Sequence, residues 1–162
     1  MRLRLRDWPG LNGPLVHVPE PFSTSDGVVS RLAFWLTPRY RVVSVAPRGD
    51  SPYQVDAVDL VGVLRQFGFA SPVLIGERRG CVVATVVAAW YPDRLAGLIL
   101  VDAESDPPPG ESIEARALRD CPPDWPRLRR AITCPLAEMS SSATSFAADV
   151  DAFLDGLKAT LP

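Results

Sequence analysis

The chain has 162 residues and a formal net charge of −2, and 47% of its residues are hydrophobic and 22% charged. A chain of this length can bury one sizeable core, so we expect a single domain over residues 1–162. The near-neutral charge gives no electrostatic reason to expect binding to nucleic acid or to an acidic membrane surface. The three cysteines follow no metal-ligand spacing, so neither a metal nor a cofactor is expected.

The sequence shows no targeting or membrane-spanning segment. No secretory hydrophobic region follows Met1, and the longest apolar run, Cys81 to Ala89, is too short to span a bilayer. We therefore predict a cytoplasmic protein with reduced thiols.

Short apolar runs rich in branched residues, each bounded by turn signals, predict strands of a buried sheet. These runs cover residues 15–18, 42–46, 72–75 and 98–101. An alternation of Arg and Leu over residues 2–7 predicts one more strand, at an edge of the sheet and with one wet face.

Helical patterns lie between these runs. They cover residues 28–36, 56–67, 81–90 and 146–161, with Gly68 as the expected C-terminal cap of the second helix. Residues 23–26 offer several N-caps for the first helix, and residues 111–119 have room for a further short one. Alternation of apolar strands and helices predicts a three-layer, doubly wound α/β fold with a mostly parallel sheet.

In such sheets ligands bind beyond the carboxyl ends of the strands. The residues expected at that edge are 17–20, 48–51, 77–79 and 102–105. The stretch from Ser71 to Trp90 is central to this edge, because Gly76 and Gly80 bracket three charged residues between a strand and a helix. A tight corner of this kind projects one side chain over the end of the sheet, and here that side chain is Arg78.

The segment Gly76-Glu77-Arg78-Arg79-Gly80 resembles the nucleophile elbow of the α/β-hydrolase superfamily, Gly-x-Ser-x-Gly between strand and helix. Residues 41–48 resemble the strand and loop before the elbow, and residues 91–102 the segment after it. The resemblance is good over residues 15–102, and residues 132–139 resemble the next strand of the family. It implies an α/β-hydrolase-like fold whose cap domain is reduced or absent, with a Pro-rich connection at residues 103–131 in its place.

The catalytic parts that the resemblance implies are missing. Arg78 stands at the serine position, and its guanidinium stays protonated, so it is neither a nucleophile nor a base. No histidine lies downstream of the elbow. Pro19 stands where the family places an amide that donates to the oxyanion, and proline has no N–H. A conventional serine hydrolase is therefore not expected.

Three residues are candidates for a different, non-covalent chemistry: Arg78, His17 and Asp102. Arg78 would orient an anionic or carbonyl group while His17 or an acid moves a proton. The alternatives are structural: His17 as a packed core histidine, and Asp102 as a helix cap or the partner of an arginine. Five further residues are ligand-binding candidates, namely Pro19, Arg48, Glu77, Arg79 and Glu104.

Other polar side chains favour structural roles. Glu77 is predicted to pair with an arginine rather than to act as a general acid, and Cys81 is predicted to pack inward from the first turn of its helix. Glu138 lies near the strand end where other members of the superfamily keep their triad acid. Trp35, Trp90, Phe34 and Tyr91 are predicted to line the core or a pocket wall.

Two hypotheses of function remain open. The first is a small-molecule-binding enzyme of hydrolase-like fold, catalysing an isomerisation, cyclisation, elimination or acyl-handling step, as in secondary metabolism. The second is a catalytically silent relative that binds a small-molecule ligand or a partner chain. The short cap region and the lack of a recognisable last strand are expected to leave an edge and a pocket mouth uncovered, which favours a homodimer.

Overall fold

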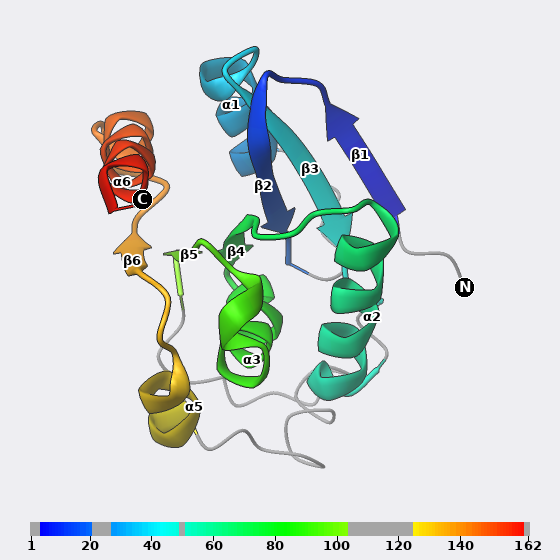
Figure 1. Cartoon of the computed structure of the whole chain (residues 1–162). Coiled ribbons are helices and arrows are strands. Elements are labelled where there is room, and N and C mark those ends of the chain that lie inside the picture. Colours follow the sequence, from blue (N-terminus) through cyan, green and yellow to red (C-terminus); the bar gives the residue numbers. More distant parts are fainter. Residues whose placement is uncertain (1–3, 21–26, 49–50, 104–124, 161–162) are drawn as a thin grey trace.

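A computed structural model of the chain describes residues 4–20, 27–48, 51–103 and 125–160, and it shows a six-stranded sheet. The strand order is β1-β3-β2-β4-β5-β6 (Figure 1). β1 runs antiparallel to β3 at one edge, and the other neighbouring pairs are parallel. The strands are β1 (Arg4–Trp8), β2 (Asn12–Val18), β3 (Tyr40–Ala46), β4 (Val73–Glu77), β5 (Gly97–Val101) and β6 (Leu136–Met139).

Helices cover both faces of the sheet (Figure 1). One face carries α2 (Tyr53–Gln66), α3 (Gly80–Trp90) and α5 (Trp125–Ala131), and the other carries α1 (Gly27–Leu36) and α6 (Phe146–Thr160). A single 3₁₀ turn, η1 (Pro92–Arg94), connects α3 to β5.

The core has two halves because successive side chains of a strand point to opposite faces. In β2, Val16 and Val18 pack toward α2 and α3, whereas Leu15 packs toward α1. Every residue of β5 is buried, as expected for a central parallel strand covered on both faces. The predicted three-layer α/β fold with a mostly parallel sheet is confirmed.

Several element boundaries differ from the sequence prediction. α2 begins at Tyr53 rather than at Asp56, because the carbonyl of Pro52 accepts the amides of Val55 and Asp56 and so starts the helix three residues earlier. Gly68 does end α2, with a φ of 68°.

Three aromatic predictions are wrong. Phe34 and Trp35 in the last turn of α1 are 78% and 59% exposed, and Trp90 at the end of α3 is 47% exposed, so none of the three belongs to the core. The buried face of α1 is made instead by aliphatic residues that include Leu32 and Leu36.

The segment predicted to replace a cap is described only in part. Its last seven residues form α5, which packs against α3. The short helix predicted at residues 111–119 lies outside the described residues.

Candidate functional site

A sharp corner joins β4 to α3 at the carboxyl edge of the sheet. Arg78 adopts the left-handed backbone conformation there, with a φ of 49°. Its amide donates to the carbonyl of Val101 on the neighbouring strand β5 at 2.9 Å. A non-glycine residue in this region of backbone space is held there by its surroundings, and such residues cluster at functional sites.

Two glycines allow the chain to turn so tightly. A Cβ on Gly80 would lie 2.0 Å from the carbonyl oxygen of Val18, and a Cβ on Gly76 would lie 2.7 Å from Cα of Cys81. Backbone therefore packs directly on backbone at both positions, which only glycine permits. The contact at Gly80 also brings the end of β2 beside the start of α3.

The Arg78 side chain projects from this corner and is 53% exposed. Its Nη1 lies 3.8 Å from Oε2 of Glu20, while Nε of Arg79 lies 3.9 Å from Oε1 of the same carboxylate. Arg79 is much less exposed than Arg78. Glu20 thus lies close to both guanidinium groups of the corner, but beyond hydrogen-bond distance from these two nitrogens.

His17 lies on β2, the neighbour of β4, and is 1% exposed. Its Nε2 lies 3.0 Å from Oε2 of Glu77, and its Nδ1 lies 3.1 Å from Oγ of Ser44. Both ring nitrogens are therefore engaged, Nδ1 by a hydroxyl and Nε2 by a carboxylate. The expected arginine partner of Glu77 is therefore wrong: Glu77 pairs with His17, because the register of β2 and β4 brings the two side chains to the same face.

Ser44, His17 and Glu77 follow the hydrogen-bond order of a Ser-His-acid triad. Ser44 is nevertheless only 7% exposed and lies inside strand β3, rather than on a turn that presents its hydroxyl to a substrate. The arrangement is a buried polar network that joins three strands. Sequence reasoning missed Ser44, although it is the one hydroxyl within the apolar run Val42–Val45.

Asp102 follows β5 and is also left-handed, with a φ of 49°. Oδ1 accepts the amide of Ser141 at 2.9 Å and the hydroxyl of Ser140 at 3.2 Å, and Oδ2 accepts the hydroxyl of Ser141. Partial burial raises the pKa of this carboxyl, but the hydrogen bonds from Ser141 and Ser140, together with the charge of Arg78, outweigh burial and hold it below its usual value. Asp102 is thus an ionised anchor for the turn after β6.

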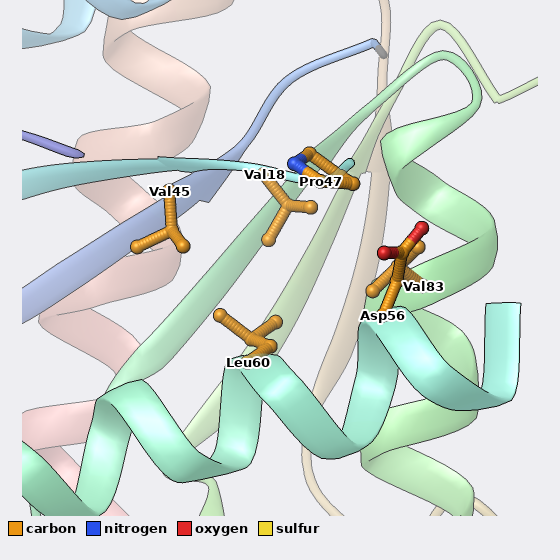
Figure 2. A pocket seen from close by; sticks show the side chains of 6 residues that line it. All are labelled: Val18, Val45, Pro47, Asp56, Leu60 and Val83. Carbon is orange, nitrogen blue, oxygen red and sulfur yellow. The ribbon is translucent and has the colours of Figure 1, made fainter. Parts of the chain in front are cut away.

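Arg48 turns away from the corner. Its Nη2 pairs with Oδ2 of Asp59 on α2 at 2.6 Å, and its amide donates to Oδ1 of the buried Asp56 at 3.3 Å. A small hollow lies beside this contact, between the ends of β2 and β3 and the helices α2 and α3 (Figure 2). Its volume of about 10 Å³ has room for one water molecule and not for an organic ligand.

The hollow is largely apolar. It is lined by Val18, Val45, Pro47, Asp56, Leu60 and Val83.

Four further residues singled out in the sequence are Pro19, Cys81, Glu138 and Glu104. Pro19 lies at the corner, where its carbonyl oxygen approaches Gly80. Cys81 packs inward as predicted, and burial raises the pKa of its thiol to about 12. Glu138 is half-exposed and pairs with Arg129 of α5. Glu104 lies outside the described residues.

The described residues contain no group of three or more His, Cys, Asp or Glu side chains placed to hold a metal ion. None of their helices combines the length and the apolar character that crossing a membrane requires.

Comparison with known proteins identifies the fold. No protein-family model matches the chain. A protein of Caulobacter segnis named "Putative carbamate hydrolase RutD" is 32% identical over 102 residues, with 52% of this chain and 38% of that protein covered. The chain thus spans less than half the length of this curated relative.

The solved structures that resemble nearly the whole chain include the following two. One is a membrane phospholipase A described as a bacterial virulence factor, with a TM-score of 0.70, 16% identity and coverage of 96% of this chain and 84% of that one. The other is a thermophilic esterase from Thermogutta terrifontis, with a TM-score of 0.65, 20% identity and coverage of 93% and 79%.

These likenesses define the class of protein. The chain is a three-layer α/β protein with a strand–corner–helix unit at the carboxyl edge of its sheet. More particularly, it has the α/β-hydrolase fold.

Proposed function

We propose that this protein binds a small organic molecule bearing a carboxylate or acyl group at the Arg78 corner, and that it forms no acyl-enzyme there. The observation that carries the proposal is the left-handed corner residue itself: Arg78 has a φ of 49° between β4 and α3. The resemblance to the nucleophile elbow implies that hydrolases of this fold present a serine at this position. A guanidinium cannot attack a carbonyl, but its planar fork of donors suits a carboxylate or a carbonyl oxygen.

The names of the similar proteins support the choice of ligand. They describe a carbamate hydrolase, a phospholipase and an esterase, whose substrates all carry acyl groups. We infer that the chain keeps the position of their acyl-binding edge and replaces the nucleophile there by a cation. By analogy with the superfamily, we propose that such a protein acts in secondary metabolism.

Binding without turnover agrees best with the surroundings of the corner. A non-hydrolytic reaction needs a group that moves a proton. His17 is buried with both ring nitrogens engaged, and the lowered pKa of Asp102 makes it a weak base. The catalytic version of the proposal, an isomerisation, cyclisation or acyl-handling step, would therefore need its proton carrier from elsewhere in the chain or from the ligand.

The variant Arg78→Gly tests the proposal. Glycine adopts a φ of 49° without strain, so the corner survives while the guanidinium is removed. We expect wild-type protein to retain a co-purified or added small acid in native mass spectrometry, and Arg78→Gly to lose it while melting at the same or a higher temperature. The same spectra measure whether the chain is the homodimer that we predict.

Labelling with a fluorophosphonate probe tests whether the protein has an activated serine nucleophile. The probe labels serine nucleophiles that an adjacent base activates, and we expect it to label neither wild-type protein nor Arg78→Gly. Labelling of Ser44, or equal retention of the ligand by both proteins, would contradict the proposal.

A further inference from the structure

Glu20 lies between the two arginines of the corner. Its two carboxylate oxygens face different guanidinium groups, at 3.8 Å from Arg78 Nη1 and 3.9 Å from Arg79 Nε. A charge-assisted hydrogen bond between such groups is about 2.7–2.9 Å long, so both contacts are roughly 1 Å longer than the optimum. The carboxylate is attracted by both cations but forms a close bond with neither of these two atoms.

The backbone, rather than this attraction, places Glu20 at the corner. The carbonyls of Val18 and Pro19 pack against Gly80, and Glu20 is the next residue along the chain. This contact between backbones does not depend on the charge of the Glu20 side chain. Neutralising Glu20 would therefore leave the two arginines and the end of β2 where they are.

Two other carboxylates near the corner, both in the described part of the chain, are already held by closer partners. Glu77 bonds to His17 at 3.0 Å, and Asp102 accepts the amide of Ser141 at 2.9 Å. Glu20 differs from both, because its ion pairs with Arg78 and Arg79 are long. The side chains of Glu20 and of these two arginines are also all partly exposed to solvent. Ion pairs of this kind contribute little to stability and are readily exchanged.

We propose that the Glu20 carboxylate occupies the place of a ligand carboxylate between Arg78 and Arg79, and that a small organic carboxylate binds by displacing it. The inference rests on the proposed function. It adds that the ligand binds through a carboxylate group and that Glu20 competes with the ligand for the two arginines. A free carboxylate can approach a guanidinium to hydrogen-bond distance and in a bidentate manner, which the tethered Glu20 does not do. A ligand must therefore replace the attraction between Glu20 and the two arginines, and a neutral ligand does not do so.

The test uses benzoate as the probe and benzamide, its neutral counterpart, as the control ligand. Dissociation constants are measured by nuclear magnetic resonance for wild-type protein, Glu20→Gln, Arg78→Gly and Asp151→Asn. Asp151 pairs with Arg39, away from the corner, so Asp151→Asn removes one negative charge without touching the site. We expect Glu20→Gln to bind benzoate about twofold to fivefold more tightly, the range that an exposed ion pair supports.

The other proteins complete the expected pattern. Asp151→Asn should bind benzoate as wild-type protein does, Arg78→Gly should bind it more weakly than either, and benzamide should show no preference among the four. In wild-type protein, benzoate should also shift the side-chain N–H signals of Arg78 and Arg79, and Glu20→Gln should do so without ligand.

Each contrary outcome has a distinct meaning. If benzoate requires Arg78 for binding and yet binds Glu20→Gln no more tightly than wild-type protein, that result refutes the role of Glu20 as a competitor and leaves the proposed function intact. An equal gain in Asp151→Asn also overturns it, because net charge alone then explains the effect. Absence of benzoate binding in all four proteins overturns the inference, while the co-purified ligand continues to test the proposed function separately.

Discussion

At the scale of single residues, the carboxyl edge of the sheet is marked by backbone strain. Arg78 and Asp102 follow the adjacent strands β4 and β5, and both have a φ of 49°. Each such residue costs about 1–3 kcal/mol unless its side chain can bond locally. Asp102 offsets this cost with hydrogen bonds from its side chain to the serine turn, whereas the Arg78 side chain lies 3.8 Å from Glu20, beyond hydrogen-bond distance. We place the function at Arg78 because no side-chain hydrogen bond among the described residues offsets the strain of its left-handed backbone.

The stability that Asp102 provides should depend on pH. Its pKa is lowered in the folded protein from an ordinary value of 3.8, so its contribution is present above that value and is lost as the pH falls through the folded pKa. We expect Asp102→Asn, which keeps the shape and tolerates the left-handed backbone, to lower the free energy of unfolding by about 1–2 kcal/mol at pH 7.

Chemical denaturation at several pH values measures this effect. The gap between Asp102→Asn and wild-type protein should close below pH 3.8. The exposed Asp155, which pairs with Lys158 at 3.4 Å, provides the control, since Asp155→Asn should change stability little at any pH. A gap of constant size across the pH range would contradict the assigned role.

At the scale of elements, the corner depends on contact between three pieces of backbone. The end of β2, the end of β4 and the start of α3 meet at Gly76 and Gly80. The His17–Glu77 pair ties the same two strands together from the opposite face of the sheet. Removing one partner of such a buried pair is more damaging than removing both, because a charged or polar group is left unpaired.

Two glycine-to-alanine substitutions distinguish the backbone contact at Gly80 from the effect that replacing any glycine has on stability. Gly80→Ala would place Cβ against the carbonyl oxygen of Val18, and neither backbone can yield, so we expect a loss of about 3 kcal/mol in the free energy of unfolding. Gly62→Ala, inside α2 with nothing within 4 Å, should instead gain about 0.5–1 kcal/mol. Thermal and urea unfolding measure both. A Gly80→Ala variant as stable as wild-type protein would show that β2 and α3 are not in contact.

At the scale of the whole molecule, the inner strands β4 and β5 are the most buried, and the edge strands β1 and β6 are the least buried. All of β5 and nearly all of β4 are buried, whereas β1 and β6 contain only exposed and partly buried residues. Edge strands also leave half of their amides without a neighbouring strand. The most stable part of the fold therefore lies directly under the Arg78 corner.

Hydrogen exchange should reproduce this gradient. We expect the amides of β4 and β5 to exchange slowest and those of β1 and β6 more than about tenfold faster. Protection of β6 equal to that of β5 would contradict the gradient. It would also indicate that a second copy covers this edge, and the measured mass would then have to be that of a dimer.

Much of the architecture was predictable from local patterns. Alternating apolar runs and helical faces predicted the layers and the parallel sheet, and the two glycines around three charged residues predicted the corner at Arg78. These features are encoded within a few neighbouring residues, because strand and helix periodicities and the backbone freedom of glycine are local properties.

The partners of the polar side chains were decided only by the tertiary structure. Glu77 bonds to a histidine 60 residues away, that histidine bonds to a serine 27 residues away, and Asp102 bonds to a serine 39 residues away. Strand order and register create these pairs, and no local pattern contains them. The amino-acid sequence by itself thus determined that an arginine takes the corner, whereas the tertiary structure decided that Glu20, and not Glu77, is the carboxylate facing it, because Glu77 and His17 lie on the same face of adjacent strands.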